Sequence, residues 1–331
     1  MHAAVVTAFD SAPTYQEVPT PTPEPGQMLV TVLASAIHPR VRSQADGSHY
    51  TSTDELPLVP GIDGVGRTHD GELRYFVLPD TSLGAMAEQT LIDPRRSVVL
   101  PGSVDPLVIA ATMNPAMSSW IALRRRIQLQ PGARVLVMGA TGNAGRMAIQ
   151  IARRLGASHV TAAGRNPAKL AQLPALGADA VIDLSRSDHL LAADLAAAGR
   201  SVDVVLDYLW GEWASKALHA IVPARADDSH ELTWLQIGSI AAPDAPIPSA
   251  ALRACNLRLI GSGQGSVAPR DILAELPALA DEVTSSDYNI NIRAVPLPDV
   301  TQAWAEASHT DDRLVISPLP HERPAPPDPA A

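Results

Sequence analysis

The first part of the chain carries short runs of apolar and β-branched residues between turns rich in proline and glycine. From residue 1 to about 110 these runs read AAVVTAF, QMLVTVLASAI, ELRYFVL, AEQTLI and SVVL. Runs of this length, separated by such turns, are typical of short strands. The pattern therefore predicts a small, irregular β domain.

From about residue 116 the pattern changes to long segments in which strands and helices alternate. SSWIALRRRI predicts a helix, and ARVLVMGA predicts a fully buried strand that runs into glycines. Helices NAGRMAIQIARRLGA, NPAKLAQLPALGA, a polar segment and EWASKALHAI then alternate with strands HVTAAG, AVIDL, VDVVLDYL, LTWLQIG and LRLIGS. Because helical crossovers join parallel strands, this part predicts an α/β fold with a doubly wound parallel sheet.

After Gly261 the pattern becomes mixed again. We expect a helix near PRDILAELPALADEV, a strand near NIRAVPL, a helix near VTQAWAEAS and a last strand DRLVISP. The α/β middle part, 116–262, is thus predicted to lie between two parts of one outer domain, 1–115 and 263–317. The proline-rich segment 318–331 is predicted to be a solvated tail, because proline blocks regular hydrogen bonding.

Composition and charge narrow the classes of function. The 331 residues suffice for two domains, and a net charge of -10 gives no reason to approach nucleic acid or an anionic membrane. Arg124, Arg125 and Arg126 form the longest basic run. Cys255 is the single cysteine, which excludes an intramolecular disulfide and cysteine-rich zinc sites. With no signal peptide and no apolar run long enough to span a bilayer, a cytoplasmic location is expected.

A glycine-rich turn follows the first buried strand of the middle domain. The segment Gly139-Ala-Thr-Gly142-Asn-Ala-Gly145 precedes an amphipathic helix, the setting in which such glycines hold the pyrophosphate of a dinucleotide. Ala140 and Gly142 would allow close approach of the backbone to the phosphates, and Gly145 would let the helix pack on the strand. The alternative is a simple tight turn. The expected cofactor-binding residues are Ala140, Thr141, Gly142, Asn143, Ala144 and Gly145.

The end of the next strand indicates which nucleotide is bound. An enzyme selective for NAD has a carboxylate there for the ribose hydroxyls, but the sequence is Gly164-Arg165-Asn166, with Lys169 one helical turn later. The Arg165 guanidinium and the Lys169 ammonium can bind a 2′-phosphate, so the sequence predicts NADPH. The alternative is a pair of ordinary surface cations.

Several motifs together resemble a known family. They are PGIDGVG from Pro60, AATMNPAMSSWIAL from Ala110, PGARVLVMGATGNAGRMAIQIARRLGA from Pro131, GADAVIDL from Gly177 and VDVVLDYLWG from Val202. Their order is similar to that of the medium-chain dehydrogenase/reductase superfamily, and more narrowly of its zinc-independent quinone oxidoreductase branch. The resemblance implies a GroES-like catalytic domain around a Rossmann domain, a cofactor between them, and a homodimer or homotetramer.

The resemblance also bears on metal binding. In zinc-dependent relatives the first motif carries a His-Glu pair, and here Ile62 and Asp63 stand at those places, with His38 and Pro39 in the region of an earlier zinc-binding cysteine. An isoleucine cannot bind zinc. We therefore expect no metal ligands and direct hydride transfer without a Lewis acid.

Two residues are candidates for catalysis. Tyr50 resembles a tyrosine of quinone oxidoreductases and 2-enoyl-thioester reductases, where a phenol could protonate a developing enolate. The alternative is that Tyr50 only lines an apolar pocket. Asn114 resembles the Asn-Pro of enoyl-thioester reductases beside the nicotinamide. It could equally cap a helix that begins near Pro115.

Other residues are expected to shape the site. Asp63 could contact the substrate, although a turn role is favoured, and His38 is assigned no catalytic role. The strand ends should place further residues at the carboxyl edge of the sheet, near the nicotinamide half of the cofactor. These are Leu209, Ile237, Gly238 and Ser239, with Trp210 as a candidate for the substrate pocket.

We therefore expect an NADPH-dependent oxidoreductase that reduces quinones or activated alkenes such as enones and enals. Two alternatives remain open. One is a 2-enoyl-thioester reductase, which would need a basic surface for the phosphates of its carrier. The other is a non-catalytic NADPH-binding or sensor protein.

Overall fold

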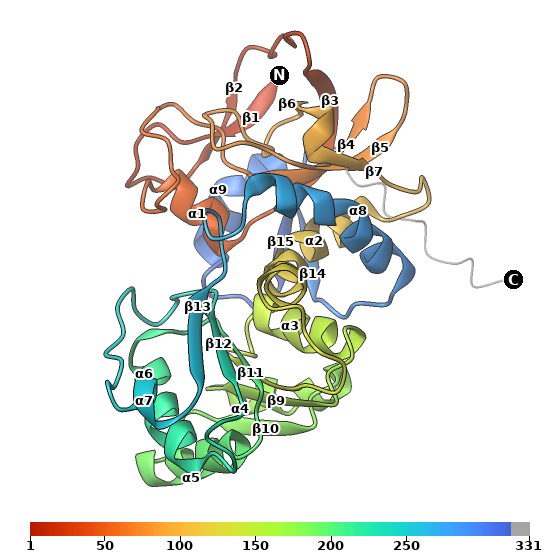
Figure 1. Cartoon of the computed structure of the whole chain (residues 1–331). Helices are drawn as coiled ribbons and strands as arrows, with labels where there is room; N and C mark the ends of the chain where they lie inside the picture. Colours follow the sequence, from red (N-terminus) through yellow and green to blue (C-terminus); the bar gives the residue numbers. More distant parts are fainter. Residues whose placement is uncertain (319–331) are drawn as a thin grey trace, which may run out of the picture. The chain divides into compact units, whose positions relative to one another are not determined.

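The computed structural model describes residues 1–318, which form two compact units (Figure 1). The first unit consists of Met1–Ala111 and the residues from Asn291 onward, and the second of Thr112–Ile290. The second unit thus lies between two parts of the first along the chain, and its bounds differ from the predicted 116–262. Helix α8 (Pro269–Ser285) lies in the second unit, where its Glu275 is bonded to Trp120.

The first unit is mainly β, as its runs of apolar and β-branched residues predict. Its larger sheet has the order β14-β15-β3-β4-β5-β7, with β6 paired to β3, and β1 and β2 form a separate pair. The strands are β1 (His2–Val5), β2 (Thr14–Glu17), β3 (Met28–Ala36), β4 (Asp63–Thr68), β5 (Leu73–Val77), β6 (Gln89–Ile92), β7 (Ser97–Val99), β14 (Ile292–Pro296) and β15 (Arg313–Ser317). The short helices α1 (Pro39–Ala45) and α9 (Val300–Glu306), with 3-10 turns at Pro94–Arg96 and Leu297–Asp299, complete it.

The second unit is built on a six-stranded sheet in the order β10-β9-β8-β11-β12-β13. All five pairings are parallel, which confirms the predicted doubly wound fold. The strands are β8 (Arg134–Met138), β9 (His159–Gly164), β10 (Ala180–Asp183), β11 (Val204–Asp207), β12 (Leu232–Gln236) and β13 (Leu257–Gly261). The α-helices are α2 (Pro106–Ile121, the last part in this unit), α3 (Asn143–Arg154), α4 (Pro167–Leu170), α5 (Asp188–Gly199), α6 (Gly211–Ile221), α7 (Ala251–Ala254) and α8.

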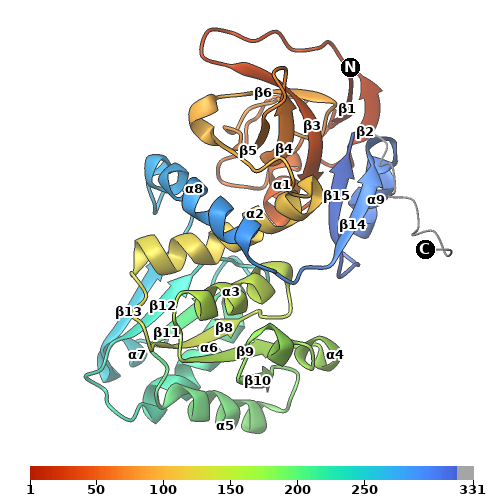
Figure 2. The same cartoon turned by 90° about the vertical axis from the view of Figure 1, so that its right-hand side faces the viewer.

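Helices cover both faces of this sheet. Figure 2 shows α3 on one face and α5 and α6 on the other. On the α5/α6 face, Leu136 and Met138 of β8 pack in one cluster with Leu195 of α5 and Leu218 of α6. These side chains are almost completely buried, as expected of parallel strands covered on both sides.

Two helix predictions are wrong in extent. The helix expected from about residue 116 begins at Pro106, where Asp105 accepts the Leu107 N–H and proline occupies the first turn. The helix expected over NPAKLAQLPALGA divides into α4 and a 3-10 turn at Leu173–Leu176. Pro174 explains this division, because its ring and missing N–H cannot continue a helix.

Helix α2 continues through a π-helical turn, Ala122–Arg126, to give the one segment of residues 1–318 that is long and apolar enough to span a membrane. This finding differs from the expectation that no apolar run is long enough to span a bilayer. About two thirds of its most apolar window, 67%, is buried inside the protein. A buried core helix has this composition. The predicted proline-rich tail lies outside the described residues, except for Pro318.

Candidate cofactor and active site

The glycine turn after β8 is held against the end of β9. The N–H groups of Gly139 and Ala140 both donate to the Ala163 carbonyl, at 3.0 and 2.9 Å. Gly139 has a φ of +85°, which favours glycine. A Cβ on Gly145 would lie 2.3 Å from the Gly139 oxygen, so the start of α3 approaches the turn as closely as glycine permits.

The exposed face of the turn is open at Gly142. This residue precedes α3, offers no side-chain cap, and a Cβ built on it would meet only the Gly139 oxygen at 3.6 Å. The first N–H groups of α3 have no acceptor within the helix. A bare backbone that faces open space beside free N–H groups suits a pyrophosphate. Ala140 does not share this role as expected, because it is fully buried and its N–H is bonded to Ala163.

The next loop begins at the buried Gly164. A Cβ there would lie 2.5 Å from Cγ2 of Thr141, so the Thr141 side chain packs against this glycine. Arg165 follows and is exposed, while the Asn166 side chain accepts the Lys169 N–H at 3.2 Å and caps α4. No carboxylate stands at the end of β9, and the exposed cation at Arg165 fits a 2′-phosphate.

Asp207, at the carboxyl end of β11, was missed by the sequence analysis. Its Oδ1 accepts the N–H groups of Leu209 and Trp210 at 2.8 and 2.9 Å, and its Oδ2 accepts Nε1–H of Trp234 at 3.0 Å. Burial raises the pKa of Asp207 more than these N–H groups lower it. An aspartate in an otherwise apolar strand is a signal that could have found it.

Asp207 shapes the loop that carries Trp210. Trp210 has a φ of +59°, an uncommon value for a residue with a side chain, and its bonded N–H holds it there. The main-chain carbonyl of Asp207 accepts the N–H groups of Ile237 and Gly238, at 2.8 and 3.1 Å. Asp207 thus fixes the loops after two neighbouring strands.

A hollow of about 310 Å³ opens at this carboxyl edge. It brings together two residues predicted from sequence, Trp210 and Ser239. Leu209 does not line it, since its side chain is 8% exposed in the core cluster. The lining residues are Trp210, Gln236, Ser239, Pro243, Leu259, Ile260 and Gly261.

Asn114 lies in the interior of α2, so the interpretation as a helix cap is wrong. It is half-buried and lies one helical turn before Ser118, whose Oγ is 3.1 Å from the Tyr208 hydroxyl. Burial raises the pKa of Tyr208 to about 12, against the lowering effect of hydrogen bonds from Ser118 and Ser119. The helix that carries Asn114 is therefore bonded to the loop that follows β11.

In the first unit, Tyr50 is well exposed. Its side chain is 72% exposed, and its ring stacks on that of His49 with centroids 4.2 Å apart. Exposed loop side chains of this kind often contact ligands.

Asp63 is buried in the first unit and begins β4, so the favoured interpretation as a turn residue is wrong. Its Oδ1 lies 3.1 Å from Nε2 of His38, and its Oδ2 accepts the Tyr75 hydroxyl at 2.8 Å. Burial lowers the pKa of His38 although the bond to Asp63 raises it, so the neutral imidazole donates to the carboxylate. Burial likewise lowers the pKa of the neighbouring Arg313 to about 10. Both Asp63 oxygens are thus engaged.

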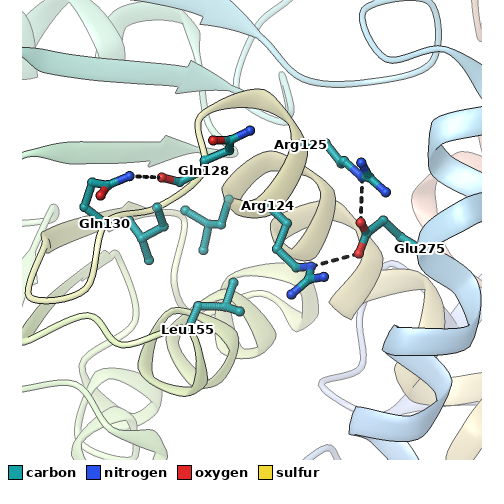
Figure 3. Close-up of a pocket in the computed structure, with 8 residues that line it drawn as sticks. Arg124, Arg125, Gln128, Gln130, Leu155 and Glu275 are labelled. Atoms are coloured by element: carbon teal, nitrogen blue, oxygen red, sulfur yellow. Dashed lines mark hydrogen bonds and ion pairs between the residues drawn. The ribbon is translucent and has the colours of Figure 1, made fainter.

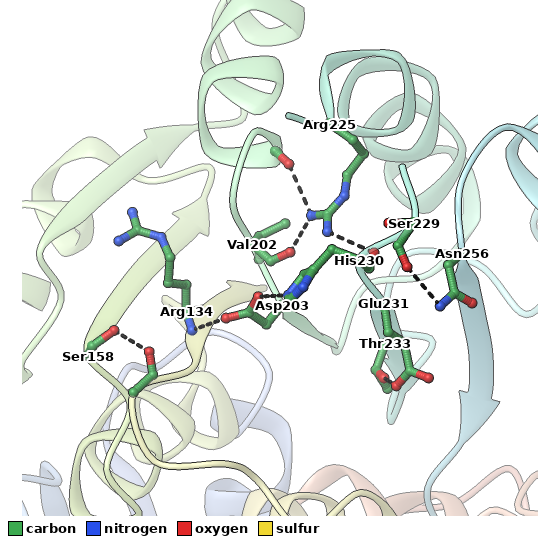
Figure 4. Close-up of polar contacts among 12 residues, drawn as sticks. Arg134, Ser158, Val202, Asp203, Arg225, Ser229, His230, Glu231, Thr233 and Asn256 are labelled. Carbon is green, nitrogen blue, oxygen red and sulfur yellow. Dashed lines mark hydrogen bonds and ion pairs between the residues drawn. The ribbon is translucent and has the colours of Figure 1, made fainter. Parts of the chain in front are cut away.

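The opposite, amino-terminal edge of the sheet in the second unit carries a separate polar cluster (Figure 4). Asp203 accepts the Arg134 N–H at 2.8 Å and lies 2.7 Å from Nε2 of His230. Arg225 donates to the carbonyls of Val202 and His230. These bonds connect the amino-terminal ends of β8, β11 and β12. The glycine turn lies at the opposite, carboxyl-terminal end of β8.

The strand order of the second unit and its open glycine turn define a dinucleotide-binding domain of the Rossmann type. A family model described as zinc-binding dehydrogenase matches residues 144–280. A probable NADPH-dependent quinone reductase of Emericella nidulans is 31% identical over 96% of this chain and 100% of its own length. The chain therefore belongs to the medium-chain dehydrogenase/reductase superfamily, in its quinone oxidoreductase-like branch.

Solved structures have the same fold. A probable oxidoreductase from Mycobacterium abscessus has a TM-score of 0.78 at 25% identity and covers 96% of this chain and 99% of its own. The quinone oxidoreductase from Thermus thermophilus, whose complex with NADPH was also solved, has a TM-score of 0.77 at 24% identity, with 96% and 100% covered. A Rossmann unit within a GroES-like, mainly β domain is the fold they share with this chain.

Proposed function

We propose that this protein is an NADPH-dependent oxidoreductase that reduces quinones or conjugated enones and enals. The observation that carries the proposal is the full-length similarity to a quinone reductase, combined with a glycine turn open to a dinucleotide. A chloroplastic NADPH-dependent alkenal/one oxidoreductase of Arabidopsis thaliana, 25% identical over 49% of the chain and 46% of its own length, supports the enone arm. NADPH, when bound, supplies the hydride.

Different residues of the second unit bind different parts of the cofactor. Gly142 and the first N–H groups of α3 bind the pyrophosphate, together with Asn143, Ala144 and Gly145. Arg165 and Lys169 bind the 2′-phosphate. Trp210, Gly238 and Ser239 border the nicotinamide half, and Asp207 holds their loops.

We further propose that the reaction needs no zinc. Ile62 has no group that can bind a metal, and His38 and Asp63 are bonded to each other. Within residues 1–318, no three His, Cys, Asp or Glu side chains are grouped so that they could hold a metal ion. Tyr50 donates the proton that follows hydride transfer, and Asn114 lies near the nicotinamide.

The protein functions in the cytoplasm as a homodimer or homotetramer. In the described chain, β13 ends the six-stranded sheet and pairs with β12 alone. An open strand edge can pair with a second copy of the same sheet. The single, buried Cys255 suits a reducing compartment.

The test is a substrate panel followed by the absorbance of NADPH. Turnover of quinones or enones, undiminished after dialysis against a chelator, is the expected result. Turnover of enoyl thioesters alone would support the rival reductase, whereas tight NADPH binding with no turnover would support a sensor. Loss of activity on chelation would contradict the zinc-free reaction.

A further inference from the structure

A groove of about 380 Å³ lies in the second unit, and the proposed function does not use it (Figure 3). Gln130 enters it from the loop before β8 and Leu155 from the end of α3, so it lies toward the amino-terminal edge of the sheet, opposite the glycine turn. The lining residues are Leu123, Arg124, Arg125, Gln128, Leu129, Gln130, Leu155 and Glu275.

Two consecutive arginines meet one carboxylate at this groove. Glu275 of α8 is 4% exposed, and its Oε2 accepts Nε–H of Arg124 at 2.8 Å. Its Oε1 forms an ion pair with Arg125, whose Nε lies 2.6 Å away. Nε1–H of Trp120 is a second donor to Oε2, at 2.7 Å. Burial alone would raise the pKa of Glu275, but these bonds hold it below its usual value. The carboxylate is therefore ionised.

The cluster carries more positive than negative charge. Glu275 neutralises one of its two arginines, and the next residue, Arg126, donates to the uncharged carbonyl of Gly261 at 2.8 Å. The Arg124 and Arg125 side chains are 41% and 42% exposed. Each guanidinium meets Glu275 through Nε and has two further nitrogens that can donate. This excess of cations stands out in a chain with a net charge of -10.

Both arginines lie in the π-helical turn at Ala122–Arg126. Turns of this kind interrupt α-helices frequently at functional sites. Figure 3 shows Arg124 and Arg125 reaching Glu275 from different sides. Leu123, Leu129 and Leu155 supply an apolar wall beside the cationic end, and Gln128 and Gln130 add amides.

We propose that this groove binds a small amphiphilic anion, namely a phosphate or carboxylate on a short alkyl or aryl body. The guanidiniums grip the anionic oxygens, which is the pairing that planar forks favour. The leucine wall covers the apolar body, and the volume suits a small molecule. Nucleic acid and membrane surfaces do not fit a groove of this size on an acidic protein.

The test is calorimetric titration of the full chain saturated with NADPH, so that the site at Arg165 is already filled. Hexyl phosphate, hexanoate and inorganic phosphate are the probes, and the two organic anions distinguish a phosphate ligand from a carboxylate ligand. Whichever organic anion matches the site binds at least about tenfold more tightly than inorganic phosphate, because its chain buries apolar surface. Added salt weakens binding.

Leu155→Glu is the variant that probes the groove, because it places a carboxylate in the groove that both arginines line and removes neither partner of the Glu275 pairs. Its expected effect is a loss of affinity of about tenfold or more. Leu190→Glu is the matched control, since Leu190 is an exposed leucine of α5, 43% exposed, away from the groove. It should bind as the wild type does.

Three results overturn the proposal: no binding of any probe, equal binding by wild type and Leu155→Glu, or binding that is seen only in protein without NADPH. Should Leu155→Glu unfold, Arg125→Lys replaces it and weakens binding because the fork is lost. If the protein does not bind NADPH, the same titrations are run on Arg165→Ala. Absence of NADPH binding would contradict the proposed function, whereas the titrations on Arg165→Ala would still test whether the groove binds an anion.

Discussion

Asp207 and Trp234 are joined by a hydrogen bond inside the second unit, with Nε1 of the indole 3.0 Å from Oδ2 of the carboxylate. Both residues are fully buried, and they lie on neighbouring parallel strands. The other carboxylate oxygen holds the loop of Leu209 and Trp210. One buried aspartate therefore ties the core of the sheet to the loop that borders the candidate nicotinamide site.

Asp207→Asn tests this relationship. An asparagine of the same shape has one oxygen for three N–H donors, so at least one buried donor loses its partner. We expect a loss of about 1–3 kcal/mol in the free energy of unfolding. Thermal or denaturant unfolding measures it, and the Michaelis constant for NADPH should rise as the loop loosens.

Trp234→Phe provides the double-mutant control because it removes one of the donors. The double variant should be less destabilised than the sum of the two single changes, by roughly 0.5–3 kcal/mol. Strict additivity would show that the carboxylate and the indole are not coupled.

Arg165→Ala tests the choice of cofactor. Losing a charged contact with the 2′-phosphate should raise the Michaelis constant for NADPH about tenfold or more and leave that for NADH nearly unchanged. Arg200→Ala is the control, since Arg200 is an exposed cation just before the amino-terminal edge of the sheet. Equal effects of Arg165→Ala on both cofactors would refute the assignment.

Tyr50→Phe tests the proton donor. The phenyl ring can still stack on His49, so only the hydroxyl is lost. If that hydroxyl protonates the product, the turnover number should fall about 100-fold or more. Tyr15→Phe is a matched control, because Tyr15 is also exposed and stacks on a histidine, His2, at 4.8 Å. An unchanged turnover number would leave Tyr50 as a pocket wall.

The parts of the fold that depend on local pattern could be predicted from the sequence. Buried apolar runs gave the strands around Val137 and Leu206, and glycine spacing located the turn before α3. Local signals also misled: Asn114-Pro115 suggests a helix start, yet the helix tolerates Pro115 in its interior. Tertiary packing of the buried face outweighs that local preference.

Partners distant in sequence could not be predicted. Glu275 lies 155 residues from Trp120, and Asp63 lies 25 residues from His38, so no periodicity relates the members of either pair. Such buried charges are explained only by the partners that the fold brings to them. Asp63 was predicted to be a turn residue because glycine follows it in the sequence. The His38 imidazole that it contacts is distant in the sequence and could not be predicted.

The buried His38 predicts a pH dependence of stability. Its pKa is lowered by burial below the unfolded value of 6.5, so the folded protein binds fewer protons than the unfolded chain below that pH. Its contribution is complete above pH 6.5 and is lost as pH falls, by at most about 1.4 kcal/mol per pH unit. Denaturant unfolding at several pH values between 7.5 and 5 measures this slope.

His38→Asn should flatten the slope whatever its effect on absolute stability. His49, whose pKa is lowered to about 4 by burial and by Arg40, acts in the same direction but is partly exposed. His49→Asn should therefore remove a smaller part of the slope. A slope unchanged in both variants would mean that neither histidine is kept neutral by the fold.

Gly142 and Gly145 allow the cofactor role of the turn to be separated from its structural role. An alanine methyl at Gly142 would face open space, with the Gly139 oxygen 3.6 Å away, and the φ of -82° suits alanine. Stability should change by less than about 1 kcal/mol. The methyl would stand where the pyrophosphate approaches, so the Michaelis constant for NADPH should rise by about tenfold or more.

Gly145→Ala should lower the stability of the fold first, and should weaken NADPH binding only as a consequence. Its methyl would lie 2.3 Å from the Gly139 oxygen and 2.6 Å from Cα of Ala140, and backbone atoms cannot move aside cheaply. We expect destabilisation of about 1–3 kcal/mol or more, seen as a lower melting temperature without cofactor. Because the damage precedes binding, saturating NADPH should recover only part of it. If Gly142→Ala also lowered the cofactor-free melting temperature by as much, the open face assigned to Gly142 would be wrong.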